Sequence, residues 1–186
     1  MNLITAIFGP APTTATTTDT SADVIRAVID RMPGIERLSL VRMVYLVQVV
    51  HLGRHGQRLL PHWFKATALG VYDEDLSREC RYRISRRSYD RTHAAPYGLS
   101  PLAEAVVDEV CEAFRSASPG QLGATTQRPG GAWSKLWEPD PCSSLPISDP
   151  RRFRARRKPV DQGPGIDIEH MMLDYDLLIQ PESLAA

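Results

Sequence analysis

Residues 39–55, with the sequence SLVRMVYLVQVVHLGRH, are apolar on nearly every side when they are placed on a helix. A helix that is hydrophobic all round belongs in the middle of a fold. The longest apolar stretch, residues 38–52, includes Arg42 and Gln48 and falls short of the roughly 20 residues that a membrane span needs. Gly56 is expected to end the helix. We therefore predict a buried central helix.

Further helices are predicted on both sides of this segment. Residues 24–32 carry apolar side chains at helical spacing and end at Pro33. Ser100-Pro101 and Ser118-Pro119 each pair a capping residue with a first-turn proline, which predicts helices over about 101–116 and before residue 129. A last amphipathic helix is expected within residues 166–179. The predicted fold class is mainly α, a compact helical domain around a central buried helix.

One small β-hairpin is expected between residues 81 and 97. Residues 81–85, RYRIS, alternate in polarity, and Pro96 and Gly98 are typical of turns. Before them, residues 72–80 predict a short amphipathic helix, and residues 57–70 predict a connection. The bulk of Trp63 and Phe64 in this connection indicates that it is anchored against the core.

Length and composition indicate one domain of ordinary globular type. The chain has 186 residues, 42% of them hydrophobic, and a formal net charge of zero. We expect a flexible lead-in over 1–20, a helical domain over 21–155, and a linker with a C-terminal helix over 156–186. No global field would steer such a chain onto DNA or an anionic membrane.

The cysteines and the N-terminus suggest a reducing compartment. Cys80, Cys111 and Cys142 are too few and too far apart for a disulfide framework or a zinc ribbon. The first residues have no basic flank and too short an apolar run for a signal peptide. We expect a cytoplasmic location and no membrane association.

No motif in the chain indicates catalysis. His51 and His55 have the i, i+4 spacing of zinc ligands, but the glutamate of a His-Glu-x-x-His motif and a third ligand are missing. His62, His93 and His170 are scattered, and no serine or cysteine lies in a nucleophile elbow. We predict a protein that is not an enzyme and has no cofactor or metal; a metal enzyme using His51 and His55 is the third and weakest reading.

A dense basic run supports an alternative function. A nucleic-acid-binding regulator would use this run, whereas a solvated stretch is the simpler interpretation of a charge block. Only Phe153 interleaves an aromatic side chain, which weakens the case for base stacking. The basic residues are Arg151, Arg152, Arg154, Arg156, Arg157 and Lys158.

The order of several short motifs resembles that of a known family. Residues 40–46, LVRMVYL, and residues 51–59, HLGRHGQRL, resemble the opening of the Panacea domain of SocA-like antitoxins. Residues 63–66, WFKA, resemble the aromatic-alanine step of that family, and residues 70–72, GVY, its Gly-Pro-Val turn with the proline missing. Leu99-Ser100 and residues 126–133 resemble its later helix start and its Thr-His…Trp signature, with glutamine in place of histidine. The resemblance covers about residues 36–155.

This resemblance implies a mainly helical antitoxin that binds and neutralises a toxin protein in a bacterial or phage toxin–antitoxin system. Its partner would be the cognate toxin, encoded by an adjacent gene, with nucleic acid as the less favoured partner. Aromatic side chains dominate protein interfaces, so residue type alone selects the candidate surface contacts. These partner-binding candidates are Tyr72, Tyr82, Tyr89, Tyr97 and Trp133.

Overall fold

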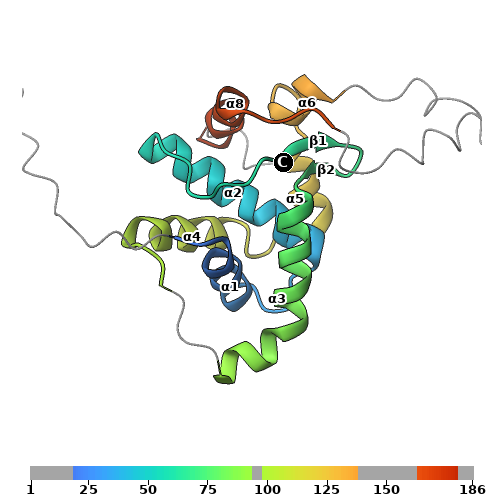
Figure 1. The fold of residues 1–186 in the computed structure, drawn as a ribbon. Helices are drawn as coiled ribbons and strands as arrows, with labels where there is room; N and C mark the ends of the chain where they lie inside the picture. The colour runs from blue at the N-terminus through green and yellow to red at the C-terminus, as the bar shows by residue number, and fades with distance from the viewer. Residues whose placement is uncertain (1–18, 94–97, 138–162, 180–186) are drawn as a thin grey trace, which may run out of the picture.

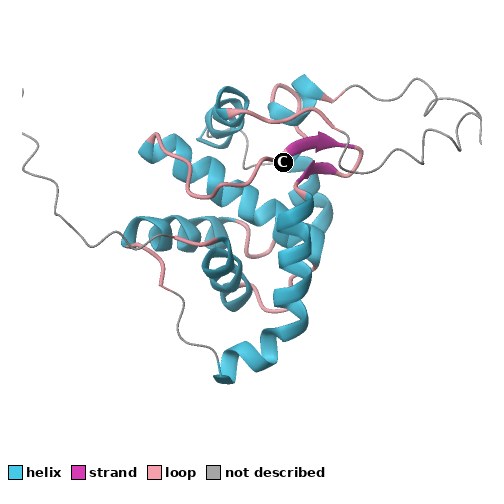
Figure 2. Ribbon diagram, in the orientation of Figure 1, coloured by secondary structure: helices cyan, strands magenta, loops and turns pink. Residues whose placement is uncertain are grey.

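The computed structural model describes residues 19–93, 98–137 and 163–179, with the side chains of 88–93 left out. This part of the chain is mainly helical and contains one two-stranded antiparallel hairpin, as predicted (Figures 1 and 2). The helices are α1 (Ser21–Arg31), α2 (Arg37–His55), α3 (Glu74–His93), α4 (Pro101–Ala113), α5 (Pro119–Thr126), α6 (Ala132–Leu136) and α8 (Ile168–Ile179). The strands are β1 (Lys65–Thr67) and β2 (Gly70–Tyr72).

The predicted central helix is confirmed as α2. Its residues from Ser39 to Val49 are all buried, and α1, α3, α4, α5 and α8 pack against it. Figure 1 shows α2 between α8 on one side and α1 and α4 on the other. Gly56 ends the helix in the left-handed conformation, with φ 68°, which glycine adopts without steric cost. Among the described residues, no helix is long and apolar enough to cross a membrane.

Local capping signals begin the surrounding helices where the sequence places them. Thr20 caps α1, Ser100 caps α4, and Ser118 forms a capping box with Gln121 at the start of α5. Asp19 joins two of these ends, because its carboxylate accepts hydrogen bonds from the Ser100 amide and hydroxyl at 2.6 and 2.7 Å. The helix starts are therefore fixed both locally and across the fold.

The predicted position of the hairpin is wrong. The hairpin spans residues 65–72, pairing Lys65 with Tyr72, and residues 74–93 form the single helix α3. Leu76, Cys80 and Ile84 lie four residues apart and face the core, which is a helical period that the alternation of residues 81–85 concealed. The former turn candidate Pro96 lies outside the described residues.

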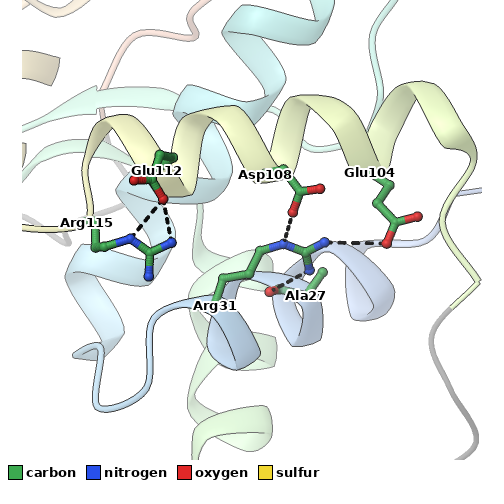
Figure 3. A network of polar contacts seen from close by, with 6 residues as sticks. All are labelled: Ala27, Arg31, Glu104, Asp108, Glu112 and Arg115. Atoms are coloured by element: carbon green, nitrogen blue, oxygen red, sulfur yellow. Dashed lines mark hydrogen bonds and ion pairs between the residues drawn. The ribbon is translucent and has the colours of Figure 1, made fainter.

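Ion pairs join α1 to α4 on the outside of the fold (Figure 3). The Arg31 guanidinium pairs with Asp108, contacts Glu104 at 3.4 Å and donates to the Ala27 carbonyl at 3.1 Å. Arg115, just after the end of α4, pairs with Glu112 in the last turn of that helix. Exposed pairs of this kind contribute little individually, up to about 1 kcal/mol. Their effect here is to balance the acidic face of α4 with arginines.

A buried arginine joins α2 to the hairpin and to α5. Arg42 is 8% exposed, and its guanidinium donates to the carbonyls of Leu69 at 3.0 Å and Pro119 at 3.1 Å. Burial lowers the pKa of Arg42 from its ordinary value. Gly123 lies against the same guanidinium, where a Cβ atom would approach it to 3.4 Å. Arg42 therefore fixes the hairpin turn against the central helix.

The C-terminal segment completes both the hairpin and the core. Ala66 donates to the Pro164 carbonyl at 2.9 Å and Ile166 to the Phe64 carbonyl at 2.8 Å, so residues 164–166 extend the edge of β1. α8, which the sequence analysis assigned to a separate C-terminal segment, packs against α2 and α6. Gly53 permits this approach, because a Cβ atom there would lie 2.3 Å from the Tyr175 ring.

A buried carboxylate connects α8 to two other helices. Asp174 is 3% exposed; it accepts from the Tyr45 hydroxyl at 2.5 Å and from the Ala132 amide, in the first turn of α6, at 2.9 Å. Burial raises the pKa of Asp174 and outweighs these hydrogen bonds, which act in the opposite direction. The same carboxylate thus joins α2, α6 and α8.

Candidate partner-binding site

A shallow cavity lies where the chain enters and leaves the hairpin. Because β1 and β2 are antiparallel, the segments 61–65 and 72–75 meet at the same end of the hairpin. The cavity has a volume of about 260 Å³. It is lined by Pro61, His62, Trp63, Lys65, Tyr72, Asp73, Glu74 and Asp75. Aromatic, basic and acidic groups therefore converge at one place on the surface.

Trp63 is the most exposed aromatic side chain in this cavity. It is 64% exposed, so the expectation that its bulk anchors the connection against the core is wrong. Phe64 takes that role: it is fully buried and packs edge-on against Tyr45 at 4.9 Å between ring centroids. The Arg58 guanidinium lies 4.4 Å from the Trp63 ring centroid and also donates to the His62 carbonyl. The Trp63 ring is thereby held in place while its surface stays open.

His62 lines the cavity, and both nitrogen atoms of its ring form hydrogen bonds in a relay of three residues. Its Nε2 lies 2.7 Å from the Ser21 Oγ, and its Nδ1 lies 3.1 Å from the Asp73 Oδ1. Burial raises the pKa of Asp73, but hydrogen bonds from His62 and from the Leu76 amide outweigh it, and the pKa is below its ordinary value. The Nδ1–H group of His62 donates a hydrogen bond to the ionised Asp73. In that tautomer Nε2 carries no proton and accepts a hydrogen bond from the Ser21 hydroxyl.

The atoms of this relay have the same order as the serine, histidine and aspartate of serine hydrolases. However, Ser21 is not among the residues that line the cavity, so a molecule bound there would contact His62 and Asp73 without contacting the hydroxyl. The relay also connects the starts of α1 and α3 with the segment before β1. We interpret it as an element that positions the cavity walls.

The sequence-based candidates do not form one cluster. Tyr72 is 8% exposed and lines the cavity, so it does not have the open surface position expected of it; its hydroxyl donates to Glu74 at 3.2 Å. Tyr82 is half-exposed on α3. Trp133 is partly buried and donates to the Thr67 carbonyl at 2.8 Å, which gives it a structural contact behind the hairpin. Tyr89 belongs to α3 without a described side chain, and Tyr97 lies outside the described residues.

The two alternative sites differ in what the structure describes. The basic residues Arg151, Arg152, Arg154, Arg156, Arg157 and Lys158 all lie outside the described ranges. The rings of His51 and His55 are tilted by 58° to one another with 4.7 Å between their centroids, and the His51 Nδ1 lies 3.0 Å from the Gln57 carbonyl oxygen. Within residues 19–93, 98–137 and 163–179, no group of three metal-binding side chains comes together.

Comparisons with family models, curated proteins and solved structures found no match to this chain. Inferences about function therefore rest on the motifs of the sequence and on the geometry of the site. Sequence reasoning missed the hydrogen bonds of His62 because Ser21, His62 and Asp73 are separated by 41 and 11 residues. The sequence offered one signal for Asp73: as a capping residue it marks the start of the helix α3.

Proposed function

We propose that this chain is an antitoxin that binds and neutralises a cognate toxin protein encoded by an adjacent gene. It acts by stoichiometric binding and carries out no reaction. Two independent lines of reasoning support this function. The ordered motifs within about residues 36–155 resemble the Panacea domain, and the mainly helical fold around α2 agrees with what that resemblance implies.

The observation that carries the proposal is the exposed Trp63 ring, which lines the cavity together with Tyr72 and is contacted by the Arg58 guanidinium. Tryptophan, tyrosine and arginine are the side chains most enriched at binding hot spots. The Trp63 ring is both exposed and already ordered by Arg58, so a partner that covers it loses little side-chain entropy on binding. We expect Trp63 to insert into an apolar pocket of the toxin.

The interface would extend beyond the cavity over the outer side of α8. A standard interface covers about 800 Å² on each partner, which is more than one tryptophan and its surroundings provide. Ile168 follows closely after Gly165, which is paired with Lys65 at the cavity, and Ile168 and Ile179 are exposed on α8. Ile168, three residues after Gly165, would supply apolar surface near the cavity, and Ile179 would extend it along α8.

The proposal is tested by expressing the adjacent open reading frame alone and together with this chain. We expect the neighbour to arrest growth, and this chain to restore growth and to elute with it in a stable complex. The antitoxin function would be refuted if the product of the adjacent open reading frame were harmless. It would also be refuted if that product were toxic but neither co-purified with this chain nor was neutralised by it.

Trp63→Ala tests the site itself. We expect the complex to weaken roughly 30-fold, the effect of losing a hot-spot side chain worth about 2 kcal/mol. Leu102→Ala is the matched control, because Leu102 is similarly exposed but lies on α4. Both variants should melt like the wild type. Equal affinities of the two variants for the toxin would show that Trp63 is not the anchor.

A further inference from the structure

α3 continues well beyond the part of it that packs in the core. Leu76, Ser77 and Cys80 are buried, whereas residues 81 and 82 are exposed. Figure 1 shows the later turns of α3 passing α1 and forming the end of the molecule opposite α6 and α8. This part of the helix is therefore available to a partner, and it is remote from the cavity at Trp63.

The distal part of α3 concentrates positive charge in a chain that has none overall. Residues 78–93 contain six arginines against Glu79 and Asp90, a net charge of +4 with His93 neutral, whereas the whole chain has a net charge of zero. Arginines near a helix C-terminus interact favourably with the helix dipole, but that effect is confined to the last turn. It accounts for Arg91 and leaves the earlier arginines unexplained.

Two of these arginines, Arg81 and Arg87, have no carboxylate partner among the described residues. Arg78 pairs with Glu74 and Asp75 at the start of the helix, and Arg83 contacts Glu79 at 4.0 Å. Arg81 and Arg87 are exposed and form no ion pair within the described part of the chain. At α4, by contrast, Arg31, Arg54 and Arg115 each pair with a carboxylate of that helix; Figure 3 shows the pairs of Arg31 and Arg115.

An exposed aromatic ring lies among these cations. Tyr82 is 50% exposed, and the guanidinium groups of Arg83 and Arg86 lie 5.6 and 5.5 Å from its ring centroid. Such cation–π contacts orient the ring without covering its outer face. Proteins that bind single-stranded nucleic acid combine a basic surface with aromatic rings on which bases stack.

We propose that residues 81–87 of α3, the arginine–tyrosine surface, bind the sugar-phosphate backbone of a nucleic acid and stack one base on Tyr82. Arg81 and Arg87 contact phosphates, since the planar guanidinium matches phosphate oxygens in pairs. The core of a protein interface is depleted of charged residues and rich in apolar anchors. Between residues 81 and 87 the only aliphatic side chain is Ile84, which packs against the core, so a phosphate backbone fits this surface better than a protein does.

The test is fluorescence anisotropy of the full chain with a labelled 20-nucleotide oligo(dT) and with a 20-base-pair duplex, at several salt concentrations. We expect binding that weakens as salt rises. Arg81→Gln/Arg87→Gln should weaken it at least 10-fold and reduce the slope of log K against log[salt] on the single strand by about 1.4, the contribution of two phosphates. Tyr82→Ala should weaken single-strand binding roughly 5- to 150-fold, with Tyr82→Phe retaining it.

Two control variants separate this surface from other basic groups. Arg54→Gln/Arg115→Gln makes the same change in net charge at arginines paired with Glu109 and Glu112, and it should leave binding unchanged. A variant with the basic residues of 151–158 replaced by glutamine should also keep the salt slope that Arg81 and Arg87 provide.

Four results would overturn the proposal. The wild type could fail to bind nucleic acid, or the Arg54/Arg115 control could lose as much nucleic-acid affinity as the Arg81/Arg87 variant. Nucleic-acid binding could be lost only in the 151–158 variant, or the Arg81/Arg87 variant could lose the toxin and keep the nucleic acid. The first three concern nucleic acid alone, so the antitoxin function stands or falls by its own experiment.

Discussion

Replacing Tyr45 by phenylalanine removes one hydroxyl from the centre of the fold and keeps the ring that packs against Phe64. The hydroxyl is the donor to Asp174, and both side chains are buried. A hydrogen bond to a charged group contributes about 1.5–3 kcal/mol, and a neutral one about 1 kcal/mol. At pH 8 we expect Tyr45→Phe to lower the free energy of unfolding by about 2 kcal/mol.

The assay is urea unfolding followed by circular dichroism, together with thermal melting. For a domain of this size, a loss of about 2 kcal/mol corresponds to a decrease of roughly 4–8 °C in Tm. As the pH is lowered through the raised pKa of Asp174, the loss should fall toward about 1 kcal/mol, because the carboxyl group becomes neutral. Tyr82→Phe is the control: its ring is half-exposed, and its stability should change by less than about 0.5 kcal/mol.

The reasoning depends on a direct contact, so Tyr45→Phe and Asp174→Asn should not be additive. Residues that share a buried hydrogen bond give coupling energies of about 0.5–3 kcal/mol in a double-mutant cycle. A Tyr45→Phe protein as stable as the wild type at pH 8, or a cycle with no coupling, would refute the view that this bond holds α8 on α2.

Three further predictions concern the same packing. Because the folded-state pKa of Asp174 lies above its ordinary value of 3.8, the folded protein binds a proton that the unfolded chain has lost, and its stability falls as pH rises from 3.8 through the raised pKa. Asp174→Asn should remove that part of the pH dependence, and parallel profiles of stability against pH for the two proteins would contradict it. Arg42→Met should lower the free energy of unfolding by about 1–3 kcal/mol, because two backbone carbonyls lose their donor. Arg42→Lys should restore only part of the lost stability. A melting temperature unchanged in Arg42→Met would count against this role. Gly53→Ala should destabilise the protein although alanine is favoured over glycine in a helix by about 1 kcal/mol, because the new Cβ meets the Tyr175 ring; a more stable variant would show that α8 yields easily.

The sequence predicted those parts of the fold that depend on nearby residues. α2 was evident because its apolar residues leave no polar side, and the starts of α4 and α5 were evident because Ser-Pro pairs carry their own capping chemistry. The hairpin was misplaced because its strands have only three residues each, and because its other bonds come from residues 164–166, about 100 positions away in the chain.

The candidate site was less predictable for a similar reason. Trp63 and Phe64 are adjacent, large aromatic residues just before β1, yet one is open and the other is buried. No local pattern tells which of the two faces the core. The relay through His62 and the cation–π contact on Trp63 both depend on pairings that only the folded chain creates.

The docking of α8 also affects the order in which the chain acquires its structure during synthesis. The ribosome completes α2 at His55, but the helix that covers its Tyr45 side is not complete until Ile179. At 5–20 residues per second, this interval lasts about 6–25 s. Throughout that time one side of the central helix remains uncovered on a nascent chain. A molecular chaperone would therefore find its binding surface on α2 before the last helix arrives.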